Sequence, residues 1–436
     1  MKYLMKRIIL FFTLAAFIGL NVHAQQEATT YEHSVATNSF WDNWFVQAGV
    51  DMILVNAYGE NFKRTFPNGK AFGINVGAGK WFTPEFGFRG GLQWDNGIIN
   101  NKDAVWLRDG RTNGMIMLSC DVLLNVLNLF GEYNAERKYN LNVFPRMGAL
   151  ATLDRFVGSP VLGLGVNNTY RVSNKLRLYA DLSYQFTSSV IGVQTDDGTG
   201  NNGFFSLDVG VQIDLGRQDF QKASARPLSY QHAVATNSFW SNWFVQAGLG
   251  MSLLNAYGRR FADVFPNGKT LGVNVGVGKW FTPQMGFRGG LNWQNGIVGN
   301  HHLGWMDPDD NPGGNHKSGG YGAAYLDVFF NLHHLFGEYD ENRFWNAIVF
   351  PRAGLNSNFQ EHSCSPLVGV GTEQTFRLSD GMKLFVDVAY QFTSSEFMKK
   401  TITSHHDGNS NGWFDLNVGV QFELGKSKGK FVKLTE

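Results

Sequence analysis

Charged residues recur at equivalent places in the two halves of the sequence, and their types and spacing suit two kinds of chemistry. They lie on the polar side of segments in which apolar residues alternate with small or polar ones. Opposite charges that line a pore select ions, whereas the same charges packed in a narrow lumen form structural ion pairs. We favour ion pairs, because an eight-stranded lumen is just wide enough for side chains. The ten candidates are Arg89, Asp121, Arg146, Arg171 and Asp181 in the first half, and Arg288, Asp327, Arg352, Arg377 and Asp387 in the second.

Other reactive residues are arranged less favourably for a reaction. Beyond residue 24 the first half contains His33 alone, so a nucleophile, histidine and carboxylate set cannot be present in both copies. Cys120 and Cys364 fall in different halves, and we expect no disulfide between them. The loop histidines lack helical spacing and a thiolate partner for a metal. We therefore expect no enzyme, no metal and no cofactor. These histidines are His301, His302, His316, His405 and His406.

An internal duplication supplies the elements that would position the charges. Tyr31–Val50 and Tyr230–Leu249 differ at four of twenty positions, at an offset of 199. The offset grows to 206 at the two VFPR motifs and to 209 at the ends of the units. Units of this length can each hold a complete core, so we expect a duplicated domain rather than a solenoid. The units span residues 31–216 and 230–425.

Within each unit the side chains alternate with a period of two, which indicates β-strands. In the first unit Trp44, Val46 and Ala48 alternate with Phe45, Gln47 and Gly49. Less regular runs at residues 115–127, 140–149 and 161–171 bring the number to eight strands per unit, each near the length that a tilted strand needs to cross a bilayer. The expected strands of the first unit begin at residues 44, 72, 86, 115, 140, 161, 176 and 205.

Short and long connections alternate along each unit, as in outer-membrane barrels. Short turns are expected at residues 83–85 and 173–174, and the second unit has insertions near 301–320 and 399–411. An even number of strands returns each chain end to the side of the short turns. We expect that side to be periplasmic and the long loops to be extracellular. These loops include residues 55–70, 97–113, 150–160 and 188–203, and 254–269 and 296–320 in the second unit.

Composition separates a membrane barrel from a soluble one. Charged residues are 17% of the chain, 52 residues are glycine, and the net charge of +1 offers no field for nucleic acid. The polar face is rich in glycine, which suits a filled lumen better than a water-facing sheet. Tryptophans such as Trp44 and Trp94 lie near strand ends, where an interfacial girdle would place them. Residues 1–24 have the basic and apolar regions of a signal peptide.

Several segments together resemble a known family. The strand–turn–strand sequence GKWFTPEFGFRGGLQW (Gly79–Trp94) is nearly repeated at Gly278–Trp293, and DVLLNVLNLFGEY (Asp121–Tyr133) and DVGVQIDLG complete the pattern. These resemble the OmpA-like outer-membrane barrels of Gram-negative bacteria. The resemblance implies eight-stranded barrels with periplasmic ends. Only eleven residues, Lys426–Glu436, follow the last expected strand, so a peptidoglycan-binding domain is not expected.

Two tandem eight-stranded barrels are favoured over one barrel of sixteen strands. Residues 217–229 form a polar linker without strand alternation, and residues 426–436 read as a solvated periplasmic tail. We expect a structural or surface-interaction protein of the outer membrane, with a porin-like diffusion channel as the alternative. The expected partners are outer-membrane lipid and host or surface ligands that the loops contact, but no nucleic acid. The sequence does not fix the oligomeric state, the arrangement of the barrels or the identity of a ligand.

Overall fold

The computed structural model describes most of both units but little of the long loops. The expected signal peptide, the five loop histidines and most of the other expected extracellular loops lie outside the described residues. The expected loop at 150–160 is shorter than predicted, because strands occupy the chain up to Thr152 and again from Gly158. The described ranges are 34–56, 70–95, 114–131, 133–153, 158–187, 202–225, 227–228, 230–237, 240–255, 269–294, 320–359, 363–394, 410–425 and 429–434.

The first unit is a closed barrel of eight antiparallel strands. Each strand pairs with its neighbour along the chain, and β1 pairs with β8 to close the barrel. A four-residue helix, α3 (Val126–Leu129), follows β4 and is capped by the Asn125 side chain. The strands are β1 (Trp44–Asn56), β2 (Lys70–Trp81), β3 (Phe86–Asp95), β4 (Met115–Asn125), β5 (Tyr139–Thr152), β6 (Gly158–Arg171), β7 (Leu176–Thr187) and β8 (Asn202–Leu215).

The second unit repeats this barrel, with β10 pairing to β17. Two barrels of eight strands are thus confirmed, and the sixteen-stranded alternative is wrong. Helix α5 (Leu332–Phe336) is the copy of α3. Among the described residues no helix is long and apolar enough to span a membrane. The strands are β10 (Trp243–Asn255), β11 (Lys269–Trp280), β12 (Met285–Gln294), β13 (Tyr321–Asn331), β14 (Trp345–Asn358), β15 (Ser363–Ser379), β16 (Met382–Ser394) and β17 (Ser410–Glu423).

The two faces of each barrel wall have opposite chemistry. Outward side chains are apolar and exposed, as at Leu118 (63%), Leu164 (64%) and Val370 (61%). Inward side chains include buried charges such as Arg89 and Asp327. A soluble barrel would expose its polar face to water and bury its apolar one. The arrangement is therefore that of a barrel whose outer surface contacts lipid.

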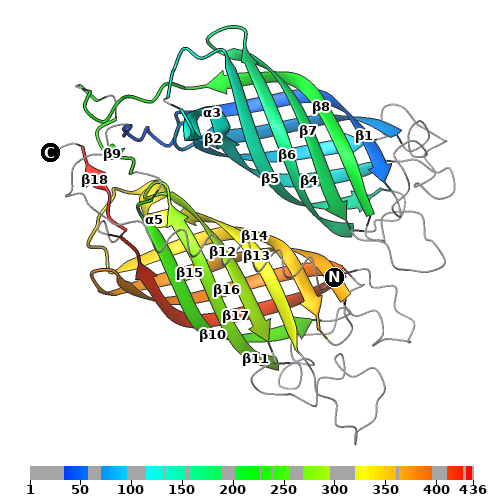
Figure 1. The fold of residues 1–436 in the computed structure, drawn as a ribbon, viewed down its shortest axis with the longest axis vertical. Helices are drawn as coiled ribbons and strands as arrows, with labels where there is room; N and C mark the ends of the chain where they lie inside the picture. The colour runs from blue at the N-terminus through cyan, green and yellow to red at the C-terminus, as the bar shows by residue number, and fades with distance from the viewer. Residues whose placement is uncertain are drawn as a thin grey trace, which may run out of the picture.

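The short connections all lie at one end of the barrels, which we call the turn end (Figure 1). They join β2 to β3, β4 to β5 and β6 to β7, with equivalent connections in the second unit. The first residues of β1 and β10 and the last residues of β8 and β17 are also at this end. We call the opposite end the loop end.

Segments outside the barrels form a small sheet at the turn end. Strand β9 (Val234–Ala235), which precedes the second barrel, pairs with β18 (Val432–Lys433) of the tail. On its other side Ala235 pairs with Ala36, and Val35 pairs with Lys222 of the linker. We call these four segments the junction sheet. Linker and tail are therefore paired backbone, which their polar sequences did not indicate.

In each unit a tyrosine hydroxyl forms a hydrogen bond with the segment that follows the last barrel strand. The hydroxyl of Tyr133 accepts a hydrogen bond from the Phe220 backbone N–H at 3.1 Å. Tyr339, the copy of Tyr133, accepts one from the Phe431 N–H at 2.9 Å. Burial raises the pKa of Tyr339 to about 12, so it remains a neutral phenol at physiological pH. The linker and the tail are thus equivalent parts of the duplicated unit.

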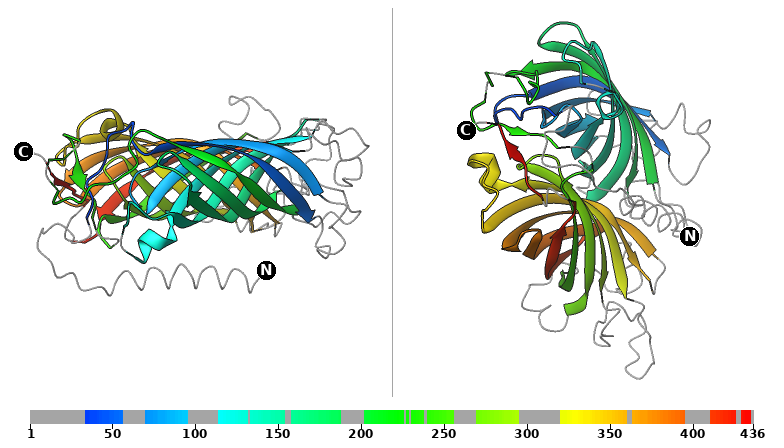
Figure 2. Two further views of the ribbon diagram at one scale, coloured as in Figure 1. Left: turned by 90° about the horizontal axis from the view of Figure 1, so that it is seen from above. Right: turned by 60° about the vertical axis from the view of Figure 1, so that its left-hand side comes forward.

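The two barrels lie side by side (Figure 2). They contact each other through outward apolar residues. Phe86 stacks on Phe281 with ring centroids 3.9 Å apart, and Phe330 meets Phe88 edge to face at 5.3 Å. The buried residues of this cluster are three equivalent pairs, related by the repeat offsets: Phe86 and Met285, Val122 and Val328, and Met147 and Ala353.

The same equivalence holds in the junction sheet. Ala36 pairs with Ala235, which is its own copy at the offset of 199. The Thr37 N–H donates to the Val234 carbonyl, and the Thr236 N–H donates to the Val35 carbonyl. A contact in which each residue meets its own copy is the mark of two-fold symmetry. The two units are thus arranged as a pseudo-symmetric dimer within one chain.

Candidate functional site

Four charges form a layer across the middle of the first barrel's lumen. Arg89 pairs with Asp121 at 2.6 Å and with Asp181 at 2.7 Å, and Arg146 pairs with Asp121 at 2.8 Å. Arg89 also donates to the Gln47 side chain. All four charged side chains are buried. Strands β3, β4, β5 and β7 supply one charge each, so the layer ties the walls of the barrel together.

The second barrel has a larger version of this layer. Arg288 pairs with Asp327, and also with Glu373 and Asp387 at 2.6 Å each. Arg352 pairs with Asp327 at 2.7 Å and approaches Asp387 at 3.5 Å. These five side chains are fully shielded from solvent. Glu373 was missed by the sequence analysis, because the first unit has Asn167 at that position. Its inward strand parity is the signal that identifies it.

Aromatic rings and glycines fill the space beside the arginines. The guanidinium carbon of Arg352 lies 3.8 Å from the ring centre of Tyr325, and that of Arg89 lies 4.9 Å from Phe144. A Cβ atom added at Gly165 would lie 2.3 Å from the Phe144 ring. Glycine at this inward position therefore makes room for the ring, as expected for a filled narrow lumen.

Apolar clusters lie in the first lumen on both sides of the charged layer, together with buried polar side chains such as Asp51, Gln93 and Asp95. Towards the turn end, Phe45, Leu123 and Phe144 form a buried cluster. Towards the loop end lies a larger buried cluster, to which the inward side chains of six strands contribute. This cluster consists of Ile53, Ala71, Met115, Met117, Leu150, Val161 and Phe204. Charges inside such layers are shielded from water on both sides.

The structure brings eight of the ten predicted charges together in these two layers. The other two, Arg171 and Arg377, were also predicted to pair inside the lumen, but they lie at the turn-end mouths of the barrels. Arg377 pairs with Asp380 of the adjoining turn. The Arg171 side chain forms no ion pair with any described residue, and its Nε atom is buried without a hydrogen-bond partner. Strand parity predicts the inward direction of a side chain but not its depth in the barrel.

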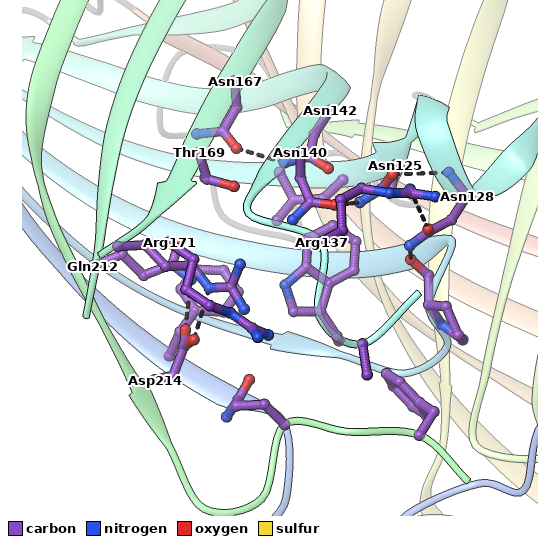
Figure 3. Close-up of a pocket in the computed structure, with 18 of the residues that line it drawn as sticks. Asn125, Asn128, Arg137, Asn140, Asn142, Asn167, Thr169, Arg171, Gln212 and Asp214 are labelled. Carbon is purple, nitrogen blue, oxygen red and sulfur yellow. Dashed lines mark hydrogen bonds and ion pairs between the residues drawn. The ribbon is translucent and has the colours of Figure 1, made fainter. Parts of the chain in front are cut away.

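A polar cavity of about 70 Å³ opens at the mouth that contains Arg171 (Figure 3). Its wall contains a chain of amides, in which Asn125 donates to Asn140 and Asn142 donates to Asn167. Arg137 donates to Asn128 at 2.7 Å. The equivalent mouth of the second barrel contains a cavity of similar size.

The described residues contain no cluster of three or more His, Cys, Asp and Glu side chains arranged to bind a metal. Cys120 is a free thiol beside the barrel–barrel contact. The side chain of Cys364 and the loop histidines lie outside the part of the chain that the structure describes. The ion pairs of the lumen can hold strands together.

Comparison with known structures finds membrane β-barrels, several of them from the bacterial outer membrane. Neisserial surface protein A is 15% identical and covers 40% of this chain and 98% of its own, with a TM-score of 0.26. Ail, the attachment invasion locus protein of Yersinia pestis, is 9% identical, and the match covers 39% of this chain and 99% of Ail, with a TM-score of 0.21. The NanC porin is 7% identical, and the match covers 87% of this chain and 100% of the porin, with a TM-score of 0.17. No family model and no curated protein matches the chain.

The closed barrels with apolar outer walls and polar lumens decide the class of the molecule. It is a transmembrane outer-membrane β-barrel protein. Its outer surface lies in lipid, and two barrels are present in one chain.

Proposed function

We propose that this chain is a non-catalytic, OmpA-like surface protein, which displays extracellular loops on two non-conducting barrels. The main support is the filled lumen of the first barrel. A buried charged layer lies between two apolar clusters there, where an ion path would need continuous water. The ion pairs would then serve to hold the wall together rather than to select ions.

The orientation belongs to the same proposal. The turn end would face the periplasm, because short turns and both chain ends lie on the periplasmic side of such barrels. Residues 1–24 would be removed as a signal peptide. The long loops would then contact host or surface ligands outside the cell.

Planar-bilayer recording tests the proposal. The purified chain should show no stable conductance, whereas a diffusion channel would show frequent, long openings. A useful positive control is Phe144→Ala combined with Arg89→Ala, which removes a ring and a charge from the filled layer and should raise conductance. Large openings of the unaltered protein, changed in size by these substitutions, would establish the porin-like alternative. Protease added to intact cells should cut within residues 296–320 and leave the linker uncut.

A further inference from the structure

Two arginines face each other at the mouth of the first barrel. Arg171 and Arg177 are directly opposed in the register of β6 and β7. Like charges in this position repel each other. Asp214 pairs with Arg177 at 2.7 Å and so compensates one of the two charges. Asp219 also lines the cavity, but it is exposed to water and forms no ion pair with the described residues.

The second barrel shows the same position with its charges balanced. Arg377 is opposed to Lys383, the copy of Arg177. Lys383 pairs with Glu423 at 2.7 Å, as Arg177 pairs with Asp214, and Arg377 pairs with Asp380. The first unit has Asn174 in place of Asp380. Each of the two opposed cations therefore has a carboxylate partner in the second barrel, where Lys430 also lies 3.9 Å from Asp380, whereas only Arg177 has such a partner in the first.

The cavity beside Arg171 has room for the missing negative charge. A volume of about 70 Å³ is several times what one water molecule needs, so a small anion fits. The buried Nε of Arg171 has an unused donor, and a guanidinium binds two oxygens of a carboxylate or phosphate at once.

We propose that the turn-end mouth of the first barrel binds a small oxyanion between Arg171 and Arg177. The anion supplies the charge that Asp380 supplies in the second barrel. Carboxylate and phosphate share the chemistry that this site requires. The site is independent of conduction and of which way the barrels face, so it does not depend on the function proposed above.

Isothermal titration of the full mature chain in a non-ionic detergent tests this site, with inorganic phosphate and acetate as separate probes. At least one of the two probes should bind at one saturable site per chain. Loss of a charge-assisted hydrogen-bond donor in Arg171→Gln should weaken binding roughly tenfold or more. Arg377→Gln is the matched control and should leave binding unchanged. The probe that binds more tightly identifies the preferred source of the charge.

Exchange of the residue that differs between the units gives a second, independent test. Asn174→Asp should weaken anion binding in the first barrel, because the new carboxylate competes for Arg171. Asp380→Asn should create a second site, with two anions bound per chain. Heat-dependent migration in gels shows whether each variant has folded barrels. The proposal is overturned if neither probe shows saturable binding to the folded chain, or if Arg171→Gln binds as the unaltered chain does.

Discussion

Asp121 and its copy Asp327 each pair with two arginines, but those arginines have more alternative carboxylate partners in the second barrel. Asp121 pairs with both Arg89 and Arg146 in the first barrel. In the second barrel Arg288 retains Glu373 and Asp387 as partners if Asp327 is lost. Asp121 and Asp327 occupy equivalent positions but have different neighbours, so a substitution of one is a control for the same substitution of the other.

We expect Asp121→Asn to destabilise the chain by about 3–5 kcal/mol, because it leaves a buried guanidinium without its charge partner. Asp327→Asn should cost less, since neighbouring carboxylates remain. Both effects can be measured as the urea concentration at which the folded barrel, which migrates differently from the heated chain in gels, is lost. Equal losses in the two variants would contradict the role given to Glu373.

A histidine of the turn end predicts a dependence of stability on pH. Burial lowers the pKa of His334 from about 6.5 to about 4, and the neutral ring contacts the Pro283 carbonyl through Nδ1 at 3.0 Å. Its buried Nε2 has no acceptor for a second proton. Below pH 6.5 the unfolded chain binds a proton that the folded chain excludes.

Stability should therefore be complete above pH 6.5 and fall by up to roughly 3 kcal/mol as the pH drops to about 4. The matched variant is His334→Asn, because Asn128 makes the equivalent contact with the Pro84 carbonyl in the first unit. Urea unfolding at pH 7.5 and pH 4.5 should show a smaller difference in the variant. An unchanged difference would assign the pH dependence to other groups.

The strands could be predicted because inward and outward side chains alternate along them. The period of two identified five strands of the unit, and three less regular runs completed the eight strands that the structure has in each barrel. It did not reveal the barrel–barrel contact, because an outward Phe88 that meets protein reads the same as one that meets lipid. The pairing of Val432 with Ala235 was equally hidden, since strands of two residues have no measurable period.

The inward glycines predict that a larger side chain at such a position destabilises the barrel. Gly165→Val should destabilise the first barrel by about 1–3 kcal/mol, because the added atoms overlap the Phe144 ring. Gly90→Val is the control on the outward face, where an added Cβ meets no atom nearer than 4.0 Å. Urea unfolding of both variants decides this. Similar stability of the two would mean that the lumen has spare room.

At the scale of the whole molecule, the pseudo-two-fold contact predicts which residues of the two units can be joined. Ala36 and Ala235 are opposed in the junction sheet, and the flanking residues make the hydrogen bonds. Cα atoms of such a pair are close enough for a disulfide.

Ala36→Cys with Ala235→Cys, in a chain in which Cys120 and Cys364 are serine, should form an intrachain disulfide on mild oxidation. A shift in gel migration that reductant reverses would detect the bond. Each single variant is a control and should show no such shift within one chain. Failure of the folded double variant to cross-link would place the units differently.

The junction sheet also has a consequence for the timing of biogenesis. Its segments come from both extremes of the described chain, Ser34–Thr37 and Val432–Leu434, so its last member leaves the ribosome after all sixteen barrel strands. A truncated product could close its first barrel yet would keep an unpaired edge at β9. Unpaired edges invite association with other chains. Completion of this small sheet would thus distinguish finished molecules from prematurely terminated ones.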